Sequence, residues 1–216
     1  MNDAHTATGP RRRGAPPAGQ RLTREAVLTR AEALIDRDGV AAFSLRALSR
    51  ELAVRPAALY NHVTSRDELL QAVTERFVAG FDLTGVGEQP WPQWVRSVAV
   101  DLRRRMLDHP ERAELVLTRA PGTPASRTFL QRFLDDLVAA GLERSTAHVA
   151  WHVMMAVVIG VVQVERPHGP DPAGTFDAVL DVALDGILVA ASRPPSDHMT
   201  ALLHAHHSAD EPTSSG

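Results

Sequence analysis

The stretch FSLRALSRELAVRPAALYNHV, which starts at Phe43, gathers the side chains best suited to chemistry with a partner. Its apolar residues recur at helical spacing on both sides of a turn of about three residues, the arrangement of a helix-turn-helix. In such a unit the first helix braces the second, and exposed residues of the second reach base edges in the major groove. The spacing therefore favours contact with double-stranded DNA, with a plain helical hairpin in a bundle as the alternative.

Two sets of side chains share this stretch. The apolar set would lock the two helices together and consists of Leu48, Leu52, Val54 and Leu59. The set left available to DNA consists of Arg55, Ala57, Ala58, Tyr60, Asn61 and His62. Alanine methyl groups suit thymine methyl groups, so sequence specificity would depend on Arg46, Arg55 and Asn61 and on DNA shape.

The distribution of charge agrees with a basic head on an acidic body. The 216 residues carry a formal net charge of −3, and every basic residue apart from histidine is an arginine. Residues 1–66 hold 11 arginines against 6 acidic residues, whereas residues 67–216 hold 12 against 20. Such asymmetry predicts that only the first part meets an anion.

Other chemistries find little support in the residues. The chain has no cysteine, which excludes disulfides and thiolate catalysis. His148 and His152 have a spacing that can hold a metal, and His204, His206 and His207 add a histidine-rich tail, but Val149 stands where a zinc hydrolase has its glutamate. A His-based metal-dependent protein remains the less favoured alternative. We expect no enzyme, no catalytic residue, no metal site and no cofactor.

Helical periodicity runs through the rest of the chain, so the predicted fold class is all-α. The first helix is expected over 24–38, and the second of the two short helices over 56–63. A capping box of Ser65 and Glu68 then opens a helix that reaches about Asp82. Further helices are expected over 91–109, 111–117, 125–140, 145–164, capped by Ser145, and 175–191, with a loop from 165 to 174.

The segment from about Gln20 to Val73 resembles the N-terminal domain of the tetracycline-repressor (TetR) family of bacterial regulators. The matching positions are Gly39, Leu45-Arg46-Leu48, Leu59-Tyr60-His62-Val63 and Ser65-Arg66-Leu69. The remainder is similar to the helical regulatory domain of that family. One departure is Ala53, where the family usually has glycine; alanine costs on the order of 1 kcal/mol if the turn needs a positive φ.

The resemblance implies a set of DNA-contacting residues. Arg46 would meet a phosphate or a base, and Tyr60, His62 and Arg66 would each meet a phosphate. The complete expected set is Ser44, Arg46, Arg55, Pro56, Ala57, Ala58, Tyr60, Asn61, His62 and Arg66. Arg11, Arg12 and Arg13 could enter a minor groove, although a solvated tail is the simpler interpretation.

The resemblance also implies a ligand-responsive repressor, with an effector-independent regulator as the alternative. We expect a homodimer through the 145–164 and 175–191 helices on a near-palindromic operator. A hydrophobic or aromatic effector, which is not identified, would occupy a pocket inside the bundle. Its expected lining is Trp94, Leu102, Met106, His109, Leu130, Phe133, Trp151, Met155 and Glu165, with plain core packing as the alternative for each apolar residue.

The predicted organisation has a three-helix helix-turn-helix domain over 20–66 and a larger helical regulatory and dimerisation domain over 67–193. Residues 1–19 and 194–216 are predicted to be disordered tails. The longest uninterrupted apolar run, 153–162, is too short for a bilayer that needs about 20 residues. No signal peptide is evident, so we expect a cytoplasmic protein without membrane contact.

Overall fold

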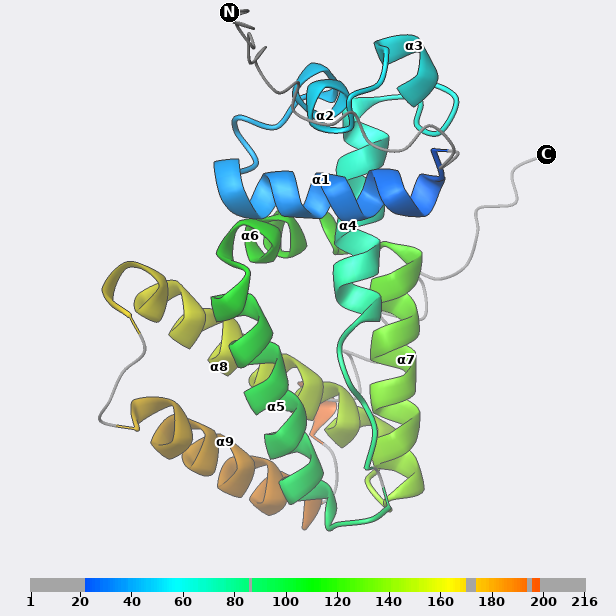
Figure 1. Ribbon diagram of the computed structural model, residues 1–216. Helices are drawn as coiled ribbons and strands as arrows, with labels where there is room; N and C mark the ends of the chain where they lie inside the picture. Colours follow the sequence, from blue (N-terminus) through cyan, green and yellow to red (C-terminus); the bar gives the residue numbers. More distant parts are fainter. Residues whose placement is uncertain (1–21, 86, 170–173, 194–195, 199–216) are drawn as a thin grey trace, which may run out of the picture.

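The computed structural model describes residues 22–85, 87–169, 174–193 and 196–198, and its regular elements are helices (Figure 1). The all-α prediction is confirmed. The helices at the N-terminal end are α1 (Arg24–Asp38), α2 (Leu45–Glu51), α3 (Pro56–Leu59) and α4 (Arg66–Ala79). They are followed by α5 (Trp91–Asp108), α6 (Pro110–Arg119), α7 (Pro124–Ala139), α8 (Arg144–His168) and α9 (Thr175–Ala191). The predicted tails, except for residues 196–198, and arginines 11 to 13 lie outside the described residues.

Capping residues set both ends of α1. The Thr23 hydroxyl accepts a hydrogen bond from the Ala26 N–H at 3.1 Å, which satisfies one of the unpaired donors of the first turn. Gly39 ends the helix with a φ of 84°, a conformation that strongly favours glycine.

Several other boundaries differ from the predictions. The third helix ends at Leu59 rather than at residue 63, and α4 ends at Ala79. The cap of α8 is Glu143 instead of Ser145, because its carboxylate accepts from the N–H groups of Ser145 and Thr146. The loop predicted to start at Glu165 begins only after His168, and Pro167 lies inside the last turn of α8.

Buried side chains form two hydrophobic clusters. The first unites α1 to α4 and receives Leu115 from α6. The second lies between α5, α7, α8 and α9. α4 takes part in both, with Val73 in the first cluster and Val78 in the second. α4 and α6 therefore join the helices at the top of Figure 1 to those below them.

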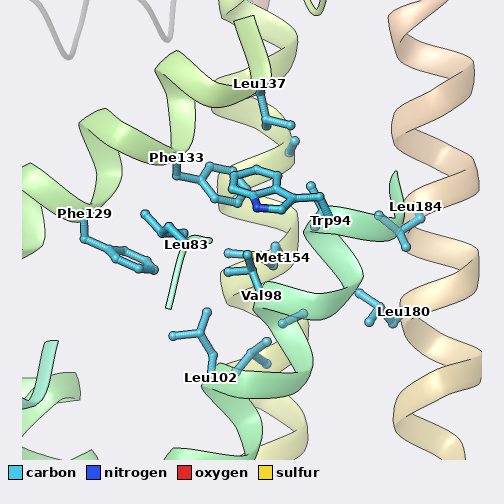
Figure 2. Packing of buried hydrophobic residues seen from close by; sticks show 14 of the residues in the cluster. Leu83, Trp94, Val98, Leu102, Phe129, Phe133, Leu137, Met154, Leu180 and Leu184 are labelled. Atoms are coloured by element: carbon cyan, nitrogen blue, oxygen red, sulfur yellow. The ribbon is translucent and has the colours of Figure 1, made fainter. Parts of the chain in front are cut away.

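Aromatic rings fill the centre of the second cluster. Trp94 of α5 stacks on Phe133 of α7 with 5.1 Å between ring centroids, and Trp151 of α8 meets Phe133 at 5.3 Å. Leu180 and Leu184 approach α5 from α9 (Figure 2). Four of the residues predicted to line an effector pocket are fully buried in this cluster; they are Trp94, Leu102, Met106 and Phe133.

α8 is longer and more apolar than its central ten-residue run suggests. By length and composition alone, Arg144–Pro167 could cross a membrane, with a mean hydropathy of 1.8, but the core helix of a soluble protein passes the same test. Here α8 packs against α5, α7 and α9, and Ala150, Met154 and Val158 are buried in the second cluster. Packing within the fold thus accounts for one side of α8, and 33% of its apolar window is buried.

Candidate nucleic-acid interface

The α2–turn–α3 unit has the geometry of a helix-turn-helix. Leu48 and Leu59 are fully buried and hold the two helices together. In the turn between them, the Val54 N–H donates to the Ser49 carbonyl at 3.0 Å. Ala53 has a φ of 54°, so this position of the turn does require the left-handed region.

Three arginines stand on the exposed side of this unit. Arg46 and Arg50 lie one helical turn apart on α2, and Arg55 directly precedes α3; all three are exposed. Within the described residues, no carboxylate or carbonyl oxygen takes a hydrogen bond or ion pair from their guanidinium groups. Guanidinium groups in this state can form bidentate contacts with phosphate or guanine at no cost in existing bonds. Arg50 was not among the predicted contacts, although its spacing of four from Arg46 indicates it.

Tyr60 is the most exposed aromatic side chain of the described residues, with 57% of its surface accessible. It stands at the C-terminal end of α3, beside the exposed Asn61 and the half-buried His62. Pro56 and Ala57 are exposed, whereas Ala58 is half-buried. A large exposed ring with a hydroxyl group suits a surface that approaches phosphate while covering apolar area.

Two predicted contact residues also serve the structure. The Ser44 hydroxyl accepts from the Ala47 N–H at 3.1 Å and caps α2. The Arg66 guanidinium donates to the carbonyl oxygens of Phe43 at 2.9 Å and Val40 at 2.7 Å. Arg66 therefore ties the start of α4 to the loop before α2, and a phosphate contact by this residue stays a prediction.

The exit from α3 is held by charged groups of α1 and α4. Arg24 donates to the His62 carbonyl at 2.7 Å and to the Glu68 carboxylate at 2.7 Å. In the predicted capping box, the Ser65 hydroxyl accepts from the Glu68 N–H as expected. The return bond is shifted by one residue, because the Glu68 carboxylate accepts from the N–H of Thr64 rather than from that of Ser65. Burial raises the pKa of Glu68, but the hydrogen bonds from Thr64 and Arg24 outweigh it and lower that pKa overall.

Comparison with known proteins assigns this unit. The family model described as bacterial regulatory proteins, tetR family, matches residues 27–73. An HTH-type transcriptional regulator of Saccharopolyspora erythraea is 30% identical over 161 residues, which are 74% of this chain and 68% of that protein.

This chain belongs to the TetR family of transcriptional regulators. TetR-family proteins are DNA-binding regulators and not enzymes, so the chain is a DNA-binding transcriptional regulator with a helix-turn-helix.

Solved structures share the fold. ActR of Streptomyces coelicolor in complex with (S)-DNPA has a TM-score of 0.69 at 23% identity and covers 80% of this chain and 100% of its own. BioQ bound to its natural double-stranded DNA operator has a TM-score of 0.63 at 27% identity and covers 77% and 98%. The predicted fold of a helix-turn-helix domain followed by a helical domain is confirmed.

The two polar residues predicted for the effector pocket lie in separate surroundings. Glu165, only 3% exposed, forms a bidentate ion pair with Arg103 of α5, at 2.6 and 2.8 Å. His109, at the α5–α6 corner, has Nδ1 3.2 Å from an Asp36 oxygen and its ring against Phe77. The pocket as a whole stays a prediction.

The histidine pair of α8 has no third ligand beside it among the described residues. His148 is buried, and the Nδ1 of His152 lies 2.8 Å from the His148 carbonyl oxygen, to which it donates. Across the part of the chain that the structure describes, no three His, Asp or Glu side chains gather in a way that could hold a metal ion.

Proposed function

We propose that this regulator is a cytoplasmic repressor that binds a near-palindromic operator as a homodimer and releases it when a small-molecule effector binds. The observation that carries the proposal is the arginine surface of α2 and α3: Arg46, Arg50 and Arg55 are exposed, and no protein oxygen among the described residues engages their guanidinium groups. Other arginines at this end, such as Arg24, Arg37 and Arg66, are held by carboxylates or carbonyls. The solved complex of BioQ with its DNA operator supports the same assignment.

Dimerisation is supported by the outer faces of α8 and α9. On α9, Val179, Val182 and Val189 are between 40 and 74% exposed at helical spacing, with Gly186 among them. On α8, Ala156 and Gly160 are exposed one turn apart. A Cβ added at Gly160 or Gly186 would meet no atom within 4 Å, so a second copy of these helices could approach closely. Burying this face between two copies would remove an apolar surface from water.

Release of DNA by an effector needs a mechanical link between the regulatory helices and the DNA-binding helices. In this proposal α6 supplies that link. Leu115 of α6 is buried in the N-terminal cluster, and Arg112 forms a bidentate ion pair with Asp36 of α1 at 2.9 Å for each contact. An effector that bound one position of α6 more tightly would shift the spacing of the two recognition helices, which a dimer holds about 34–36 Å apart.

The test is selection of operator DNA from a random library with the full chain, followed by affinity measurements at several salt concentrations. We expect an inverted repeat to be enriched. The double variant R46Q/R55Q should bind it at least tenfold more weakly, and the salt slope should fall by about 0.9 for each phosphate that the variant no longer neutralises. The matched control is R144Q, which removes an exposed arginine of α8 that pairs with Asp135. Enrichment of no repeat, or wild-type affinity of R46Q/R55Q, would refute the proposal.

A further inference from the structure

Arg24 begins α1 with a charge that does not suit its position in the helix. The first turn of a helix carries the positive end of the helix dipole, so a cation there is disfavoured. The Arg24 guanidinium binds groups 38 and 44 residues further along the chain, at the end of α3 and in the first turn of α4. These distant contacts, and not the helix that it begins, therefore account for an arginine at this position.

The ion pair of Arg24 with Glu68 holds two backbone groups of the loop between α3 and α4. Arg24 Nη1 donates to the His62 carbonyl at 2.7 Å, and Nη2 donates to Glu68 Oε1 at 2.7 Å. The second carboxylate oxygen, Oε2, accepts from the Thr64 N–H at 2.9 Å. A carbonyl and an N–H two residues apart are thus bound by the two ends of one ion pair, which we call the Arg24–Glu68 clamp.

The clamp lies next to side chains that are offered to DNA. The exposed Tyr60 and Asn61 directly precede His62, whose carbonyl the clamp holds. From the inside, the carbonyl of buried Leu59 accepts from the N–H groups of His62 at 2.9 Å and Val63 at 3.2 Å. α3 has four residues, and a helix this short is fixed by its surroundings more than by its own hydrogen bonds. The placement of Tyr60 therefore depends on contacts such as the clamp.

We propose that Arg24 is a positioning residue for DNA binding: through the Arg24–Glu68 clamp it holds the end of α3 so that the Tyr60 hydroxyl reaches a phosphate. Arg24 touches no DNA in this assignment. Its Nη1 and Nη2 donate to protein oxygens, whereas Arg46 and Arg55 have no such partner among the described residues. The contact with phosphate rests on the operator binding proposed above; the placement of Tyr60 does not.

The experiment is a double-mutant cycle on operator affinity, measured with the full chain. R24K keeps the charge, but a single ammonium group lacks the fork that reaches both partners. R24K and Y60F should each weaken binding about fivefold, the loss expected for one hydrogen bond. Together they should weaken it little more than either alone, because the hydroxyl is already displaced in R24K. R24K combined with R55Q should instead show the product of the two separate losses.

The salt slope separates positioning by Arg24 from direct contact with DNA. R24Q removes the charge, so a phosphate contact by Arg24 would lower the slope by about 0.9, whereas positioning leaves the slope unchanged. E68Q is the second clamp variant: it leaves one acceptor oxygen where the carboxylate has two, and its loss of affinity should likewise fail to add to that of Y60F.

A second readout needs no DNA. Tyr60 is the only tyrosine of the chain, so incorporation of 3-fluorotyrosine gives one fluorine NMR resonance. In the free protein, R24K and E68Q should each move this resonance towards its position in the unfolded chain. R144Q, which removes an exposed arginine of α8, should leave the resonance in place. Thermal melting monitored by circular dichroism identifies the temperatures at which each variant is folded, and both readouts are taken there.

Three results would overturn the proposal: natural affinity of folded R24K, full multiplication of the R24K and Y60F losses, or a fluorine resonance that neither clamp variant moves. A salt slope lowered by about 0.9 in R24Q would assign Arg24 to a phosphate instead. A failure of the proposed function has a different signature, namely a natural chain that binds no operator. In that case the fluorine resonance alone decides whether Arg24 positions Tyr60.

Discussion

Ala53 illustrates how a single backbone angle affects the stability of the DNA-binding unit. It has a φ of 54°, and it is the one described non-glycine residue with a positive φ. In this region the Cβ of an L-residue approaches the following carbonyl oxygen, at a cost of about 1–2 kcal/mol. The turn between α2 and α3 keeps its hydrogen bonds despite this strain, because buried Leu48 and Leu59 hold both flanks.

The variant A53G is expected to be more stable than the natural chain. Glycine removes the strain but loses more conformational entropy on folding, so the free energy of unfolding should rise by about 1 kcal/mol or less. Urea denaturation measures this difference. The matched variant A47G, in the right-handed backbone of α2, should lose about 1 kcal/mol. Equal destabilisation by both substitutions would contradict the assignment of strain to Ala53.

At the scale of elements, α4 and α6 determine how the two clusters are joined. α4 runs through both clusters, and α6 inserts Leu115 into the first while Glu111 accepts from the Val40 N–H at 3.2 Å. The start of α4 is fastened to the same loop by Arg66, through the carbonyls of Val40 and Phe43. The loop between α1 and α2 is therefore held from two sides, which fixes where α2 begins.

Substitution of Arg66 tests whether this residue braces α4 or contacts DNA. R66Q should lower the free energy of unfolding by about 1–2 kcal/mol, because two carbonyl oxygens lose a charged donor. If Arg66 only braces α4, the salt slope of operator binding should stay unchanged; if it also contacts a phosphate, as the family resemblance implies, the slope should fall by about 0.9. R55Q is the natural comparison, since it should leave stability unchanged and reduce that slope by about 0.9. A reduced slope with unaltered stability in R66Q would assign it to phosphate instead.

At the scale of the whole molecule, α9 lies at the opposite end from the helix-turn-helix (Figure 1) and carries exposed valines on its outer side. The large side chains of α9 divide between two directions: Phe176, Leu180, Leu184 and Ile187 enter the core, while Val182 is 74% exposed. This division would let one helix serve the core and an interface at once.

V182E should therefore convert a dimer to a monomer, because a carboxylate at the centre of an apolar interface would be buried without a partner. Sedimentation velocity at micromolar concentration measures the change. Operator affinity should fall along with it, since two half-sites are no longer bound together. V138E, which places the same charge on an exposed valine of α7, should remain dimeric. A natural chain that sediments as a monomer would refute the interface.

Local features of the sequence were sufficient for most helices and for the helix-turn-helix. A cap such as Thr23 and a stop such as Gly39 act on the backbone within four residues, so their effect can be predicted from neighbours alone. The same holds for the strained position of Ala53. Boundaries were less certain where two local signals compete, as at Glu143 and Ser145, or at Pro167 near the end of α8.

Only the tertiary structure decided which charged and aromatic side chains are already engaged in hydrogen bonds, ion pairs or ring contacts within the protein. Arg46, Arg55 and Arg66 are alike in sequence, yet Arg66 is bonded to carbonyls 23 and 26 residues away while the other two stay available for DNA. The stacking of Trp94 on Phe133 likewise joins residues that are distant in the chain. Helical periodicity tells which face of a helix is buried, but the partner on that face depends on how the helices cross, because hydrogen bonds and ion pairs act only over a few ångströms.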